Sequence, residues 1–151
     1  MTKLISALMT AALIGGGAAA PAAAQATKEV LQLPGRQPNP TLSAVIKVGD
    51  MLYLSGQLGS LPGQGLAPGG VGPETKQSLE NIKSILEAAG SSMERVVKCT
   101  VFLADVADFR AMNDVYRTFF PSDPPARSTV AVAGLVANAR VEIECMALAG
   151  K

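Results

Sequence analysis

Two charged residues near the C-terminus, Arg127 and Glu142, lie inside segments that otherwise have the composition of buried strands, residues 125–130 and 141–145. Burying a charge is costly unless the charge is paired or used. A guanidinium matches a planar carboxylate, and a glutamate can accept a proton from water. The two residues are therefore candidates for a site that binds an organic acid and activates water. The alternative is an ordinary ion pair or an exposed strand end.

The first 24 residues have the pattern of a secretory signal peptide. Lys3 is the only charge before Lys28, residues 4–13 are apolar, and Ala22-Ala23-Ala24 supplies an A-x-A cleavage site. The apolar stretch is too short for a good membrane span, although an uncleaved anchor is an alternative. We expect a periplasmic or secreted protein that is cleaved after Ala24 and has no stable membrane association.

The remaining chain divides into an extended lead-in, residues 25–40, and one domain, residues 41–151. Removing Lys3 from the 13 basic residues leaves 12 against 12 acidic ones, and the sequence has no tryptophan. Nucleic-acid binders usually carry a basic excess and stacking aromatic residues. We therefore expect no nucleic-acid partner.

The two cysteines, Cys99 and Cys145, lie in separate alternating apolar runs without CxxC spacing, and the chain has no histidine. This pattern excludes a zinc site. Export would permit a disulfide. We favour two buried free thiols, because neither cysteine lies in a turn-rich framework.

Hydrophobic periodicity predicts seven main elements after the lead-in, in the order ββαβαββ. Residues 44–48 and 51–54 form a hairpin through Gly49-Asp50, and a glycine-rich connection without a nucleotide-binding motif follows. The later segments are a helix from Gly72 to Gly90, a strand over 96–103, a helix opened by Asp105 and Asp108 and ended by Pro121, and strands near 127–135 and 141–148.

This order predicts an α+β sandwich, in which one mainly antiparallel sheet carries two helices on one face. On the two closing strands we expect one face to hold Val130, Val132, Ile143 and Cys145, and the other to hold Thr129, Ala131, Glu142 and Glu144. The second face has no third layer to cover it. We therefore expect other subunits to cover it in a homo-oligomer.

If the last two strands form a hairpin, the Cα atoms of Arg127 and Glu142 lie ~15 Å apart along the sheet. A small substrate cannot contact both within one hairpin, so another segment or an adjacent subunit must bridge the gap. Ser55-Gly56 is a candidate wall of such a site, because a glycine at a strand end lets a ligand approach the backbone. A simple strand end is the alternative there.

Several strings together closely resemble the Rid (YjgF) family of enamine/imine deaminases. They are Tyr53-Leu54-Ser55-Gly56-Gln57, Glu74-Thr75-x-Gln77-x-Leu79-x-Asn81-Ile82, Asp108-Phe109-x-x-Met112-Asn113-x-x-Tyr116, Pro125-Ala126-Arg127-Ser128-Thr129-Val130 and Val141-Glu142-Ile143-Glu144. The resemblance extends from about Ser43 to Leu148. It implies a chorismate-mutase-like fold and a homotrimer with sites between subunits.

The resemblance also implies an activity, the hydrolysis of 2-aminoacrylate and related 2-imino acids to 2-keto acids and ammonia without a cofactor or metal. Arg127 would pair with the substrate carboxylate, and Glu142 would activate the attacking water. Ser55, the Gly56 backbone and Asn113 would line the pocket. The Thr129 backbone would orient water or the departing amine.

The chain departs from the family pattern before the first strand, including at Leu42 and Ala44, and again at Thr129. Many deaminases read Gly-Pro-Tyr-Ser-Gln where this chain reads Pro40-Thr41-Leu42-Ser43-Ala44, so Leu42 replaces the tyrosine that closes the pocket. Thr129 stands where a cysteine is common. A leucine makes the pocket more apolar and removes a hydroxyl hydrogen bond.

A different class of function stays open from the sequence, a non-catalytic trimer that binds carboxylate metabolites or shields unfolded proteins. Retention of both Arg127 and Glu142 favours the enzyme. Nuclease activity is a third reading, and the neutral charge and the missing histidine argue against it.

Overall fold

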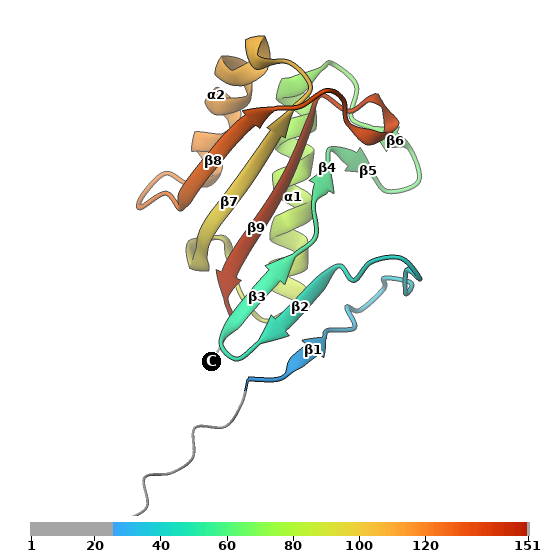
Figure 1. Ribbon diagram of the computed structural model, residues 1–151, viewed down its shortest axis with the longest axis vertical. Helices are drawn as coiled ribbons and strands as arrows, with labels where there is room; N and C mark the ends of the chain where they lie inside the picture. The colour runs from blue at the N-terminus through green and yellow to red at the C-terminus, as the bar shows by residue number, and fades with distance from the viewer. Residues whose placement is uncertain (1–25, 151) are drawn as a thin grey trace, which may run out of the picture.

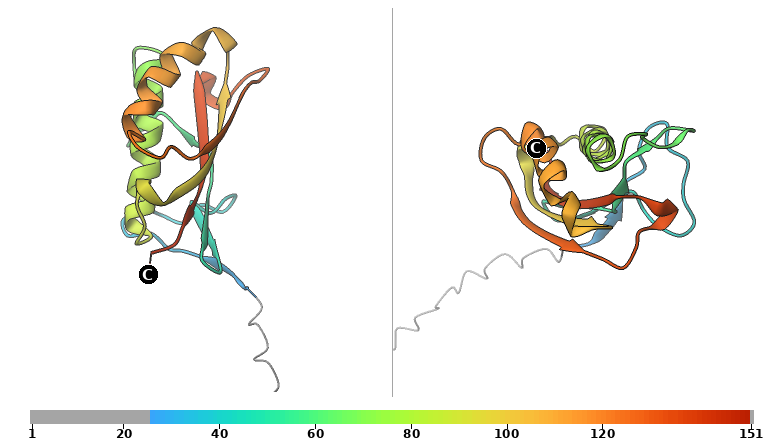
Figure 2. Two further views of the ribbon diagram at one scale, coloured as in Figure 1. Left: turned by 90° about the vertical axis from the view of Figure 1, so that its left-hand side faces the viewer. Right: turned by 90° about the horizontal axis from the view of Figure 1, so that it is seen from above.

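Two helices cover one face of a mainly antiparallel sheet in residues 26–150, the part of the chain that the computed structural model describes (Figures 1 and 2). The sheet order is β1-β2-β3-β9-β7-β8, with β4 added beside β9. Its strands are β1 (Lys28–Val30), β2 (Val45–Val48), β3 (Met51–Leu54), β4 (Gln57–Leu58), β7 (Val96–Leu103), β8 (Ala126–Ala131) and β9 (Val141–Leu148). The predicted α+β layering is confirmed. The predicted leader lies outside the described residues.

The hairpin predicted before the glycine-rich connection is confirmed. Strands β2 and β3 pair antiparallel, with Val48 opposite Met51 and Val45 opposite Leu54. The turn residue Gly49 has a φ of 56°, a left-handed conformation that glycine adopts without steric cost. The hairpin fixes the position of Ser55-Gly56 at the end of β3.

The first predicted helix is also confirmed, as α1 (Val71–Ala88). Leu79, Ile82, Ile85 and Leu86 are fully buried, as their three- and four-residue spacing predicts. Gly90, with a φ of 74°, follows the last turn. No helix within residues 26–150 is long and apolar enough to cross a membrane.

The second helix, α2 (Phe109–Phe119), follows the short 3-10 turn η2 (Val106–Asp108). The Asp105 carboxylate caps η2 by accepting a hydrogen bond from the backbone N–H of Ala107 (2.9 Å). Met112 and Tyr116 are the buried residues of α2. Figure 2 shows α1 and α2 side by side on one side of the sheet.

The hairpin predicted for the last two strands is wrong. Strand β7 lies between β8 and β9, pairing parallel with β8 and antiparallel with β9 (Figure 1). The chain reaches β9 from β8 through the short 3-10 turn η3 (Val136–Asn138). Strand β8 is therefore an edge strand, and it ends at Ala131 instead of Leu135.

The facing predicted for β8 is wrong as well. Arg127 and Thr129 pair with Cys99 and Val101, which are fully buried under the helices. Neighbouring residues on paired strands point to the same face, so Arg127 and Thr129 point toward the helices. Val130 lies on the open face and is 46% exposed. On β9 the prediction holds, because Ile143 and Cys145 are buried and Glu142 alternates with them.

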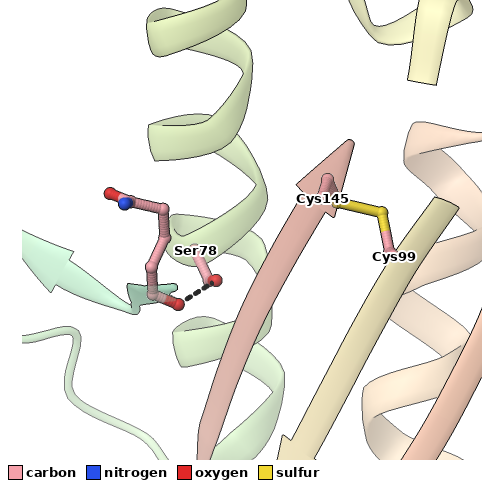
Figure 3. Close-up of a disulfide and its surroundings, with 4 residues drawn as sticks. Ser78, Cys99 and Cys145 are labelled. Carbon is pink, nitrogen blue, oxygen red and sulfur yellow. Dashed lines mark hydrogen bonds between the residues drawn. A yellow bond between two sulfur atoms is a disulfide. The ribbon is translucent and has the colours of Figure 1, made fainter. Parts of the chain in front are cut away.

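The two cysteines form a disulfide, so the prediction of two free thiols is wrong. Cys99 on β7 lies directly opposite Cys145 on β9, with 4.1 Å between their Cα atoms (Figure 3). Their separation of 46 residues in sequence hid this pairing. A bridge needs two facing cysteines on adjacent strands, and only the strand order supplies that.

Three short segments outside the predicted elements add to the fold. The lead-in contributes β1, which pairs antiparallel with β2 and places Val30 opposite Ile46. The glycine-rich connection contains β4 and a small hairpin of β5 (Ser60–Leu61) and β6 (Gly65–Leu66). Short strands such as these carry too few residues to show a two-residue periodicity.

Candidate active site

The predicted site residues form two groups, and the first surrounds Arg127. The Arg127 guanidinium lies 4.5 Å from the centre of the Tyr116 ring and 5.8 Å from the centre of the Phe109 ring. A hollow of about 280 Å³ opens beside it. The lining residues of the hollow are Asn113, Tyr116, Arg117, Phe120, Pro124, Pro125 and Arg127. We call Asn113, Tyr116, Arg127 and Thr129 the Arg127 half-site.

The charge of Arg127 is held by aromatic faces. Among residues 26–150, no carboxylate forms a salt bridge with it. A cation over an aromatic ring gains about 0.5–2 kcal/mol, which orients the guanidinium without neutralising it. The Arg127 half-site can therefore accept an external anion.

Burial raises the pKa of the Tyr116 hydroxyl to about 12, and the Arg127 charge partly opposes this rise. The ring therefore stays neutral across the physiological range. The hydroxyls of Tyr116 and Thr129 are both buried and have no hydrogen-bond partner among the described residues. A buried hydroxyl without a hydrogen-bond partner typically lowers the free energy of unfolding by about 1–3 kcal/mol, so these two groups destabilise the folded protein.

The second group surrounds Glu142, which lies between the buried residues Val141 and Ile143 and therefore points to the open face of the sheet. Its carboxylate contacts Gly56 so closely that a Cβ at position 56 would overlap it. Glu142 makes no salt bridge within residues 26–150. We call Leu42, Ser55, Gly56 and Glu142 the Glu142 half-site.

Backbone hydrogen bonds hold the strand end at Ser55-Gly56 in place. The Ser55 N–H donates to the Ala44 carbonyl (3.1 Å), and its hydroxyl donates to the Ser43 carbonyl (2.7 Å). Leu42 directly precedes this pair of carbonyls and is 52% exposed. Ser55 and Gly56 are therefore held at the strand end that contacts Glu142, and Leu42 lies in the segment that holds them.

Helix α1 anchors the segment after Gly56. The Ser78 hydroxyl donates to the Gln57 carbonyl (2.7 Å), the bond dashed in Figure 3. The Asn81 amide donates to the carbonyls of Leu58 (3.1 Å) and Ser60 (3.0 Å). These bonds fix the backbone against which the Glu142 side chain packs.

A buried carboxylate fixes the start of β9. Glu74 on α1 is only 5% exposed, and its carboxylate accepts a hydrogen bond from the Arg140 backbone N–H (2.7 Å). The Arg140 side chain donates to Asp108 (2.7 Å). This network holds the chain two residues before Glu142.

The two half-sites do not meet within one chain. Arg127 points to the helix face and Glu142 to the open face, on strands that β7 separates. Arg127 on β8 pairs with Cys99 on β7, which in turn pairs with Cys145 on β9, and Cys145 is three residues from Glu142. At ~3.3 Å per residue and ~4.8 Å per strand, their Cα atoms lie ~14 Å apart. The predicted separation was close to this value, although the hairpin that led to it does not exist.

Sequence reasoning missed three of the supporting residues. Tyr116 and Glu74 were named only within the strings that carry the resemblance, and Ser78 was given no role in the site. For Tyr116 the available signal was its position three residues after Asn113 and seven after Phe109, which places the three on one helix face. No group of three or more potential metal ligands occurs within residues 26–150.

Comparisons with known proteins agree with this architecture. The model of the family Endoribonuclease L-PSP matches residues 35–149. A goat (Capra hircus) 2-iminobutanoate/2-iminopropanoate deaminase is 51% identical over 109 residues, which cover 72% of this chain and 80% of the relative.

Two solved structures resemble the fold. Yeast YEO7 superposes with a TM-score of 0.76 at 36% identity, covering 83% of this chain and 100% of that one. Escherichia coli TdcF with bound serine superposes with a TM-score of 0.69 at 37% identity, covering 74% and 90%. The chain therefore belongs to the Endoribonuclease L-PSP family, the family of the Rid (YjgF) proteins.

Proposed function

We propose that this protein hydrolyses small 2-imino acids, of the 2-iminopropanoate and 2-iminobutanoate type, to 2-keto acids and ammonia without a cofactor. Relatives from goat, cattle and human that carry the name 2-iminobutanoate/2-iminopropanoate deaminase are 45–51% identical to the chain. This identity supports the reaction class.

One observation carries the proposal. Arg127 and Glu142 are both half-buried, and within residues 26–150 neither has a salt-bridge partner. A structural ion pair would have joined them to opposite charges. Their unpaired state favours a role toward a ligand that carries a carboxylate and reacts with water.

The reaction then needs only binding and proton transfer. Arg127 pairs with the substrate carboxylate through two parallel N–H···O bonds. Glu142 takes a proton from water while the water oxygen bonds to the imine carbon, and it passes this proton to the imine nitrogen, which gives a neutral carbinolamine. A second proton then moves from the carbinolamine hydroxyl to the nitrogen by way of the same carboxylate, so that the C=O bond forms as the C–N bond breaks and ammonia and the keto acid are released. An imine carbon is already electrophilic, so positioning supplies much of the acceleration.

We place the reaction between subunits of a homotrimer, with Arg127 from one copy and Glu142 from the next. The opposite facing of the two half-sites supports this arrangement. The open face of the sheet supports it too, because it exposes large apolar side chains. These side chains are Val30, Tyr53, Val130, Met146 and Leu148. An exposed patch of this kind is typical of an interface.

Export of the protein is also part of the proposal. The Cys99–Cys145 disulfide supports it, because disulfides persist mainly in oxidising compartments. Fractionation of the native host followed by N-terminal sequencing tests both export and cleavage after Ala24. Recovery of an uncleaved chain from the cytoplasm would refute both.

The activity is tested by generating 2-iminobutanoate with an amino-acid oxidase and following its decay. We expect the wild-type protein to speed the decay, and Arg127→Ala and Glu142→Gln to lose this effect. Arg110→Ala and Glu87→Gln are matched controls, since both residues are exposed and lie on the helices. Decay at the buffer rate with folded, trimeric wild type would favour the alternative of a carboxylate-binding or chaperone-like trimer.

A further inference from the structure

A pocket outside both half-sites lies in the segment between β1 and β2. It has a volume of about 310 Å³, within the range of small-molecule sites. Its lining residues are Val30, Leu31, Gln32, Leu33, Arg36, Gln37, Pro38, Asn39, Leu42, Ser43 and Ala44. Only Leu42 in this set belongs to the half-sites.

Local bonds give the pocket a defined shape. Leu33 is buried in the core, and the Leu31 N–H donates to the Val45 carbonyl (3.4 Å). A turn at Gly35, where φ is 73°, brings the Arg36 N–H to the Leu33 carbonyl (3.2 Å). The Asn39 side chain accepts hydrogen bonds from both the backbone and the hydroxyl of Thr41. The walls are therefore set by the fold of this segment.

The charged and polar side chains of the pocket indicate which chemical group it can bind. Arg36 is the single ionisable residue in the lining of the pocket. No residue within 26–150 forms a salt bridge with Arg36. Three amide side chains, of Gln32, Gln37 and Asn39, offer further donors. One guanidinium without a second cation matches a carboxylate better than a phosphate dianion.

The pocket adjoins the Glu142 half-site. Its inner end is Leu42-Ser43-Ala44, and the carbonyls of Ser43 and Ala44 hold Ser55, the residue before Gly56. Leu42 therefore belongs to the segment that connects the pocket to the strand end beside Glu142.

We infer that Arg36 receives a second carboxylate, so that this enzyme prefers 2-imino acids with an acidic side chain. The inference rests on the proposed deaminase function. Leucine at position 42 provides the apolar wall along which the methylene groups of such a side chain pass. Arg36 then pairs with the distal carboxylate while Arg127 holds the one next to the imine.

Binding of the products tests the pocket without catalysis. Titration calorimetry at constant ionic strength compares 2-oxoglutarate with 2-oxobutanoate, which lacks the second carboxylate. We expect the dicarboxylate to bind at least about tenfold more tightly, as one charge-assisted pair allows. Arg36→Gln should remove this difference, and Lys83→Gln, an exposed cation on α1, should retain it. Equal affinities, or a preference that survives Arg36→Gln, would overturn the inference.

Turnover measurements test the role of Arg36 separately from the proposed deaminase function. The ratio of kcat/KM for the imines of glutamate and 2-aminobutanoate should fall about tenfold in Arg36→Gln. An unchanged ratio in an active enzyme refutes the role of Arg36 and leaves the deaminase function standing. Absence of turnover with both imines refutes the deaminase function, and the calorimetry still decides whether Arg36 binds a second carboxylate.

Discussion

The two half-sites are built by different means. In the Arg127 half-site an edge strand meets α2, and the guanidinium is oriented by the rings of Tyr116 and Phe109. In the Glu142 half-site the carboxylate packs against a glycine whose neighbours are held by hydrogen bonds from Ser55, Ser78 and Asn81. Side-chain packing positions the charge in one half-site, and a fixed backbone positions it in the other. A substitution should therefore harm each half-site by a different mechanism.

The largest effect is expected when each half-site is inactivated on a different chain. Arg127→Ala and Glu142→Gln should each lower kcat/KM by about 100-fold or more, since each removes a charged group from the reaction. Co-refolding equal amounts of the two inactive variants should restore about a quarter of wild-type activity, because one site in four then joins an intact Arg127 to an intact Glu142 of the next copy.

Neither variant alone regains activity under the same refolding, and this is the control. If the mixture stays inactive while forming mixed trimers, both residues act within one chain, and the assignment of the half-sites to neighbouring copies is wrong.

The disulfide joins β9, which carries Glu142, to β7, which pairs with the strand of Arg127. Replacing both cysteines by alanine should lower the free energy of unfolding by about 3–4 kcal/mol, the loop-closure value for a separation of 46 residues. Denaturant unfolding measures this loss. Reductant should destabilise the wild type and leave the double variant unchanged.

The KM of the folded double variant sharpens the comparison. We expect it to stay near the wild-type value, since neither cysteine belongs to a half-site. A raised KM without loss of stability would show that the bridge positions Arg127 through the neighbouring strand.

Gly56→Ala tests the fixed backbone of the Glu142 half-site. The added methyl group would overlap the Glu142 carboxylate and displace it, and we expect kcat to fall about 10–100-fold. Gly134→Ala is the matched control, because a Cβ there has no atom within 4 Å. Wild-type turnover in a folded Gly56→Ala protein would remove Glu142 from the proposed mechanism.

The smallest effect concerns the packing of the Arg127 half-site and appears only at high pH. The hydroxyl of Tyr116 has an ordinary pKa of 10.0 and a folded-state pKa of about 12. Between these values the unfolded chain binds fewer protons than the folded one, so stability falls as pH rises. Below pH 10 this decline has not begun, and the free energy of unfolding has its full value. The loss is about 1.4 kcal/mol per pH unit.

Tyr116→Phe should remove this part of the alkaline decline, as measured by urea unfolding at pH 9, 10.5 and 11.5. Tyr53→Phe, on the open face, is the control and should keep it. An identical decline in wild type and Tyr116→Phe would show that the hydroxyl reaches solvent in the folded protein.

Much of the local structure could be predicted, because it depends on neighbours in sequence. The spacing of Leu79, Ile82 and Leu86 predicted α1, and Gly49-Asp50 predicted the turn of the first hairpin. The candidate residues Arg127 and Glu142 stood out because charges are rare within strand-like segments. Strand pairing was harder to predict. The parallel partnership of β8 with β7 joins segments more than twenty residues apart, and no local pattern records it.

The sequence by itself determined the order of the main helices and strands and the identity of the charged candidates, since periodicity, turn residues and the cost of burying charge act locally. The tertiary structure alone decided that β7 lies between β8 and β9. That strand order pairs Cys99 with Cys145 and turns Arg127 toward the helices while Glu142 faces the open side. The facing of a strand follows from its neighbours, because side chains alternate and a different partner or register reverses every one of them.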